Sequence, residues 1–160
     1  MSHIVLLSCT KAKLDTESPA VELYSKSPMF QKTLAYGKSL RPDKMYILSA
    51  KHHLVDLDQK LSPYDKTLKE MPKAERDEWG QEVEKQMNSK GINPSQDKFT
   101  FLTGAEYAKP LTDIIPEENI EKPMEGKRMG ERLQWLNTQI KNIKEIIIKV
   151  KNILYEYLKK

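Results

Sequence analysis

An unbroken helical pattern at the C-terminal end limits the folds open to this chain. Residues 128–160 contain no proline, and apolar side chains recur there in alternating steps of three and four. This seam consists of Leu133, Leu136, Ile140, Ile143, Ile147, Val150, Leu154 and Tyr157. The repeat predicts a helix of about 33 residues, roughly 50 Å long. A small domain cannot cover that length, so part of the helix should project or find a partner.

Self-association is the interpretation that the seam favours, because its 3.5-residue period continues for more than three heptads. Ile146 and Ile153 widen the seam on one side, which favours more than two strands; an antiparallel pair, and packing along the helix's own domain, are the other arrangements. We therefore expect an α/β core domain over 1–127 and an oligomerisation helix over 128–160. Residues 114–126, with two prolines and a glycine, form the expected hinge.

The part before this helix alternates strand and helix patterns. Three β-type segments are expected at His3–Ser8, Lys44–Ser49 and Lys98–Thr103, the first two with near-continuous apolar centres. Helical patterns cover 19–26, 29–40 and 72–90. Strands separated by helices pair in parallel, because a parallel connection needs a crossover. The expected fold class is α/β, a small and mainly parallel sheet flanked by helices.

Composition excludes several classes of protein. A length of 160 residues with 38% hydrophobic residues suits one domain with a core, and a single cysteine excludes a disulfide framework. The longest apolar runs fall far short of the roughly 20 residues that span a bilayer, and no signal peptide is evident. We expect a cytoplasmic protein that does not bind membranes. Glycine-rich nucleotide loops and zinc spacings are missing from the sequence, so no cofactor and no metal are expected.

The net charge of +4 belongs to the tail. Residues 141–160 hold six lysines and two glutamates, which leaves 21 basic and 21 acidic residues in the rest of the chain. A nucleic acid would therefore bind the body through a local cluster such as Lys11, Lys13 and Lys51.

Polar, small-residue segments follow all three predicted strands. Ligands of open parallel sheets bind beyond the carboxyl ends of the strands, so these segments are candidates for one site. Hydroxyl groups and lysines suit a phosphate, a histidine exchanges protons near neutral pH, and Gly104 allows a close backbone approach. The candidate residues here are Ser8, Cys9, Lys11, Lys13, Ser49, Lys51, His52, Gly104 and Tyr107.

An ordered string of residues resembles a known family. The string runs through Ser8-Cys9-Thr10-Lys11-x-Lys13, Pro19-Ala20, Leu23-Tyr24-Ser25 with Phe30, Leu48-Ser49-Ala50-Lys51-His52, Pro63-Tyr64-Asp65, and Gly104 with Tyr107. Over about residues 3–136 it resembles a bacterial and phage domain family of uncharacterised function. That family is distantly similar to the YaaA peroxide-stress proteins and to a domain of archaeosine synthase, both tied to nucleic acids, and to glycosylase-like folds. This chain has His53 where the family has glycine, so the turn changes or a second imidazole enters the site.

The resemblance implies cleavage of an N-glycosidic bond. In this interpretation Asp65 steadies positive charge at C1′ or orients water, and His52 assists the departing base. Tyr24 and Tyr64 stack on the base, and Lys11 and Lys13 hold phosphate. The structural alternatives are a helix cap for Asp65, a turn residue for His52, and core packing for the aromatic residues and Cys9.

The hypothesis from the sequence is a nucleic-acid-processing enzyme of the N-glycosidase type, acting on a modified base in DNA rather than RNA. One alternative is a non-catalytic DNA-binding stress or defence protein, whose lysine-rich tail meets phosphate. The other is an enzyme for a small nucleotide or nucleoside, for which the charge-balanced body is sufficient.

Overall fold

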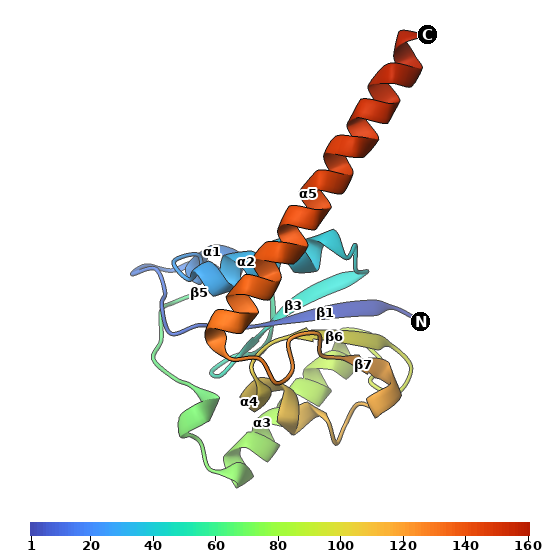
Figure 1. The fold of residues 1–160 in the computed structure, drawn as a ribbon. Helices are drawn as coiled ribbons and strands as arrows, with labels where there is room; N and C mark the ends of the chain where they lie inside the picture. The colour runs from blue at the N-terminus through green and yellow to red at the C-terminus, as the bar shows by residue number, and fades with distance from the viewer.

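A computed structural model describes all residues, 1–160, and its centre is a five-stranded sheet with the order β4-β3-β1-β6-β7 (Figure 1). Four strands are parallel and β4 is antiparallel to β3. The strands are β1 (His3–Ser8), β3 (Lys44–Ser49), β4 (His53–Asp56), β6 (Lys98–Leu102) and β7 (Ile120–Glu121). The expected α/β class with a mainly parallel sheet is confirmed. The antiparallel β4, formed right after β3 by a tight turn, was not foreseen.

The central strand explains why the sheet is parallel. Residues Ile4–Leu7 of β1 are fully buried, and β1 pairs with β3 on one side and β6 on the other. Leu6 lies opposite Tyr46 of β3 and Phe101 of β6. An apolar run buried on both faces is typical of a central parallel strand covered by helices.

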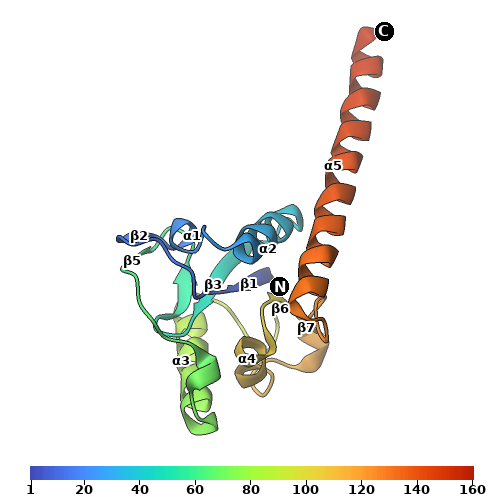
Figure 2. The same ribbon diagram turned by 60° about the vertical axis from the view of Figure 1, so that its left-hand side comes forward.

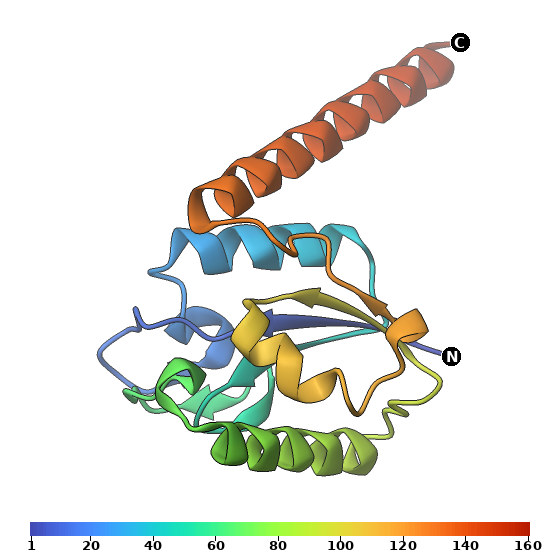
Figure 3. The same ribbon diagram turned by 60° about the horizontal axis from the view of Figure 1, so that its bottom comes forward.

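Helices cover both faces of the sheet (Figure 3). On one face, α2 (Pro28–Ser39) begins where the Ser27 hydroxyl oxygen accepts a 3.1 Å hydrogen bond from the Phe30 amide. On the other face, α3 (Lys73–Ser89) buries Trp79, Val83 and Met87, the residues whose spacing predicted this helix. These helices and the sheet between them enclose the core.

Short elements surround this sandwich. The helix expected over 19–26 is wrong in extent, because Pro19 belongs to β2 and pairs with β5; only one turn, α1, follows it. The short elements are α1 (Ala20–Leu23), α4 (Ala105–Ala108), β2 (Ser18–Pro19), β5 (Lys60–Leu61), η1 (Leu68–Glu70), η2 (Lys109–Leu111) and η3 (Glu117–Asn119).

The last helix, α5 (Met129–Lys159), leaves the core as a long rod (Figures 1 and 2). Its first half packs on α2: Leu136 is fully buried, and the Trp135 ring meets the Tyr36 ring edge-on at 5.0 Å. From Lys144 to the end of the chain every residue is exposed. The expected projection is therefore confirmed, although the helix is anchored on the core domain through its first turns. None of the helices has the length and apolar character that crossing a membrane requires.

Candidate functional site at the carboxyl end of the sheet

Three neighbouring strands bring the predicted segments together. Ser8 ends β1 and Ser49 ends β3, while Gly104 lies two residues beyond β6. Because β1 lies between β3 and β6, their carboxyl ends are adjacent. The Cys9 thiol lies 3.2 Å from the Tyr107 hydroxyl of α4. Residues almost one hundred positions apart thus share one end of the sheet.

Tyr64 is the centre of a buried hydroxyl chain. Its hydroxyl lies 2.7 Å from the Ser49 hydroxyl and 2.7 Å from the Tyr24 hydroxyl. The Ser49 oxygen accepts hydrogen bonds from the amides of Lys51 and His52 at 3.3 and 3.0 Å. Both of its acceptor positions are then used, so Ser49 donates to Tyr64 and Tyr64 donates to Tyr24. This chain ties the loop that holds Tyr64 to the end of β3.

Two accessible groups lie against the Tyr64 ring. The Lys13 ammonium lies 4.4 Å from the ring centroid, and the His52 ring meets it edge-on at 5.5 Å. Lys13, His52 and Tyr64 are half-buried, whereas Asp65, the next residue along the chain, is exposed. The Lys13 and His52 side chains therefore lie against the Tyr64 ring, and the exposed Asp65 lies near enough for its charge to act on Lys13; we call these four residues the Tyr64 cluster (Lys13, His52, Tyr64 and Asp65).

Burial decides the protonation of the groups in and below this cluster. It raises the pKa of Tyr24 to about 12 and raises the pKa of both Tyr64 and Tyr107 well above the ordinary value. These phenols stay neutral near pH 7 and act as hydrogen-bond donors rather than bases. Burial also lowers the pKa of Lys13, although Cys9 and Asp65 oppose the change.

The turn after β3 keeps a glycine-like conformation without glycine. His53 has φ of 67°, in the left-handed region that favours glycine. Its ring stacks on Trp79 at 6.3 Å between centroids, with an interplanar angle of 28°. The histidine therefore adopts the backbone conformation that glycine favours, and its imidazole packs on Trp79 of α3, whereas His52 contacts the Tyr64 ring.

The two histidines predict a pH dependence of stability. Burial lowers the pKa of both His52 and His53, with the nearby charge of Lys51 acting in the same direction on His52. The unfolded chain binds protons at its ordinary pKa near 6.5, where the folded chain does not. The free energy of unfolding should therefore fall as pH drops below about 6.5. Urea titrations of a His52→Gln, His53→Asn double variant should show a flatter slope there; an unchanged slope contradicts this origin.

Several predicted roles need correction because the side chains are buried. Tyr24 and Ser49 are completely buried, so Tyr24 cannot stack on an extruded base. Cys9 and Tyr107 are 9% and 5% exposed and face each other. These residues lie below the accessible surface of the site. Phe30, 1% exposed, packs in the core as the alternative interpretation held.

The structure also tests purely structural explanations for Asp65 and Gly104. Asp65 caps no helix, since the Thr67 hydroxyl accepts from the Lys69 amide at the start of η1. The carboxylate of Glu106 lies 2.7 Å from where a Cβ of residue 104 would be, so this close approach requires glycine; Gly104 also lines a smaller hollow together with Ser8 and Thr103. Lys11 and Lys51 are exposed beside the cluster.

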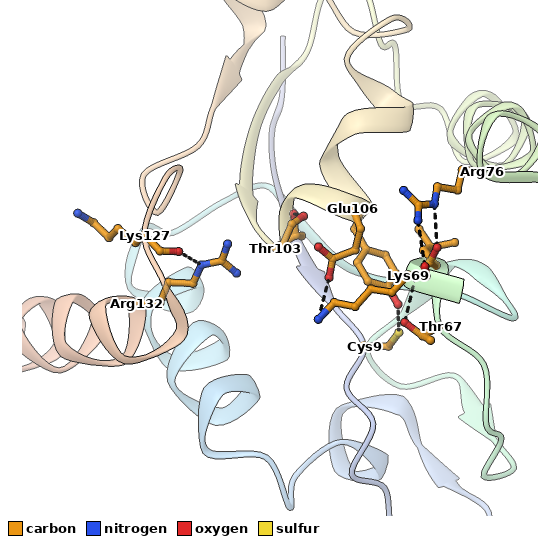
Figure 4. Close-up of polar contacts among 11 residues, drawn as sticks. Cys9, Thr67, Lys69, Arg76, Thr103, Glu106, Lys127 and Arg132 are labelled. Carbon is orange, nitrogen blue, oxygen red and sulfur yellow. Dashed lines mark hydrogen bonds and ion pairs between the residues drawn. The ribbon is translucent and has the colours of Figure 1, made fainter. Parts of the chain in front are cut away.

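A cavity of about 260 Å³ opens at the same end of the sheet, beyond β6, and motif reasoning missed it. Its basic lining residues are Lys109, Lys122 and Arg132. Lys122 pairs with Glu125 at 3.2 Å, and the Arg132 Nε donates to the Lys127 carbonyl at 2.9 Å, which leaves the other guanidinium nitrogens free (Figure 4). These residues come from connecting segments and α5, where no motif marks them. Charge counting would not have found them either, because residues 109–132 hold five basic and six acidic residues.

A smaller hollow lies beside this cavity. It shares Thr103 and Arg132 with the cavity and reaches Ser8 and Thr10 after β1. Figure 4 shows Thr103 between Arg132 on one side and Cys9 on the other. Lys11, His52, Asp65 and Tyr107 line neither of these two spaces.

Comparison with known proteins places the whole site inside one family. A family described as a family of unknown function (DUF6884) matches residues 4–138. The chain belongs to DUF6884. The DUF6884 match contains every candidate residue and ends within α5, before the exposed half of that helix. No curated protein and no solved structure matches the chain.

Proposed function

We propose that this DUF6884 protein is a nucleic-acid-processing enzyme of the N-glycosidase type, acting on a modified base in DNA. The observation that carries the proposal is the Tyr64 cluster, in which a lysine and an imidazole lie against one ring and an exposed carboxylate follows that ring along the chain, at the carboxyl end of a parallel sheet. We include in this proposal the distant resemblance to YaaA proteins and archaeosine synthase that the sequence motifs suggest, which implies the same class of substrate. A cytoplasmic location would give the enzyme access to DNA.

Each group has a role in this reaction. Lys11, Lys13 and Lys51 bind phosphate, and the half-buried Tyr64 ring contacts the base. The bond between C1′ and the base nitrogen breaks, the base keeps the electron pair, and a water oxygen bonds to C1′. Asp65 steadies positive charge at C1′ and accepts a proton from that water. Because its pKa is lowered by burial, His52 is neutral near pH 7 and helps the base leave by donating a hydrogen bond.

Abasic sites are the product that tests this function. Incubating the full chain with DNA of known base modifications should yield them, and Asp65→Asn should lower the rate by about 10²–10⁴-fold, the range of a general acid or base. Asp58→Asn is the matched control, because Asp58 is an exposed carboxylate in the neighbouring turn. Tight binding of every tested DNA without product contradicts the enzymatic proposal and favours the non-catalytic DNA-binding alternative.

That DNA-binding alternative depends on the tail. It predicts salt-sensitive binding that is lost when residues 144–160 are removed, because this segment holds five of the six lysines between 141 and 160 and every residue in it is exposed. Truncation at residue 130 would be unsuitable, since it removes the buried Leu136. The N-glycosidase proposal predicts that chemistry survives the shorter truncation.

The cavity beyond β6 favours a second candidate, an enzyme for a small nucleotide or nucleoside. About 260 Å³ suits a small ligand, and Lys109 and Arg132 provide positive charge for a phosphate. A competition titration separates the candidates. If a mononucleotide displaces labelled DNA only at high concentration, the result supports the DNA enzyme. A mononucleotide that binds alone, and binds less well after Arg132→Gln, supports the second candidate.

A further inference from the structure

The free half of α5 exposes an apolar surface that the rest of the chain leaves uncovered. Beyond Ile143 nine large apolar side chains are at least 47% exposed. Six of them belong to the heptad seam or its flank: Ile146, Ile147, Val150, Ile153, Leu154 and Tyr157. Exposed apolar side chains scattered singly are ordinary, but a continuous stripe marks an interaction surface.

The period of the stripe identifies the kind of partner. A straight helix drifts by about 20° per heptad from a 3.5-residue repeat, so a strict repeat suits a partner helix that supercoils around it. The repeat continues from Leu133 on the core to Tyr157 near the end of the helix. The free half has about 16 residues, roughly 24 Å. An isolated helix of that length is marginal in water, so packing must stabilise it.

We propose that the free half of α5 packs in parallel with α5 of a second copy of this chain. In a parallel assembly the position before the first seam residue of a heptad faces the position after the second seam residue of the partner. Those positions hold Ile146 and Ile153 on one side and Lys144 and Lys151 on the other. The facing residues are five positions apart in sequence, so Lys151 lies beside Ile146, which its hydrocarbon stem covers. Lys144 lies beside Gln139, and lysines do not face lysines.

The width of the stripe indicates more than two helices. Isoleucine occupies both kinds of seam position, at Ile143 and Ile147, and the flanking isoleucines enlarge the apolar face beyond a two-stranded seam. The core domains all lie at the same end of such a bundle, so their bulk does not obstruct it. The bundle joins several copies of the candidate site without entering any of them.

The mass of the full chain in solution tests this proposal. Sedimentation equilibrium of the wild type should give a multiple of the 18.6 kDa chain mass. The triple variant Ile147→Gln, Val150→Gln, Leu154→Gln should be monomeric and lose helical circular dichroism from the tail. The matched triple variant Glu145→Gln, Lys149→Gln, Asn152→Gln changes the same helix off the seam and should keep the wild-type mass.

Disulfide formation tests whether the α5 helices are parallel. In the double variant Cys9→Ser, Leu154→Cys an interchain disulfide should form rapidly, because parallel helices place identical residues opposite each other. An oligomer of this variant that forms no such disulfide overturns the parallel orientation. A monomeric wild type, or an unchanged mass of the seam variant, overturns the proposal. A monomeric wild type that binds vesicles of anionic lipid overturns it in favour of a membrane surface, the other partner of a basic amphipathic helix.

Discussion

Replacing Trp79 with alanine is expected to lower the free energy of unfolding by about 3–5 kcal/mol, the range for a buried tryptophan. Its side chain is 3% exposed and touches three parts of the site. The indole N–H donates to the Ser49 carbonyl at 2.9 Å, the ring stacks on His53, and it meets the Tyr107 ring at 5.8 Å. The variant loses packing volume and leaves the carbonyl at the end of β3 without its partner.

Denaturant titration followed by circular dichroism measures this loss. Trp135→Ala is the matched control, because that half-buried tryptophan packs on α2 at the base of α5 rather than in the main core. The loss of unfolding free energy in Trp135→Ala should be clearly smaller than in Trp79→Ala. Trp79→Phe should fall between the two, since it keeps most of the apolar volume but loses the hydrogen bond. Equal losses for the two alanine variants would show that Trp79 does not anchor the site.

Replacing Asp97 with alanine is expected to lower the free energy of unfolding by about 3–6 kcal/mol, because each of its two hydrogen bonds, being made to a charged group, contributes about 1.5–3 kcal/mol. This carboxylate is 7% exposed and accepts from the amides of Ser2 and Asn93, both at 2.8 Å. It joins the start of β1 to the loop before β6. Its loss leaves two partly buried donors unpaired where the central strand enters the sheet.

Asp43→Ala is the matched control for this change. Asp43 also binds an amide at the start of β1, that of His3 at 2.7 Å, but the bond is exposed to solvent. Its loss should cost less than about 1 kcal/mol. Asp97→Asn keeps one acceptor and should be intermediate. Similar unfolding free energies for the Asp97→Ala and Asp43→Ala variants would contradict the role assigned to burial.

Local sequence patterns predicted the long strands and helices well, because apolar runs and capping residues lie within or next to these elements. The expected boundaries of β1 and β3 agree with the structure, since an apolar run of this length suits a central strand. The start of α2 follows from Ser27 before Pro28, a cap and a first-turn proline. Short elements such as β2 and β5 were missed, because each has two residues and exists only through pairing with the other.

In the candidate site, too, some features were predictable from local sequence and others were not. Residue types and their position after the strands predicted which segments meet, because parallel strands end on the same side of a sheet. Which side chains remain accessible was not predictable: Tyr24 and Tyr64 look equivalent in the sequence, yet Tyr24 is fully buried and Tyr64 is half-buried. Burial depends on residues brought in from elsewhere, here the loop that follows β5.

The amino-acid sequence alone determined the α/β class, the parallel pairing and the projecting helix, because periodicity and capping are properties of neighbouring residues. Only the tertiary structure decided that His53 turns to Trp79 while His52 turns to Tyr64, and that Arg132 of α5 lines a cavity beyond β6. The physical reason is that contacts between distant segments depend on how helices and loops pack around the sheet, and no local pattern encodes that packing.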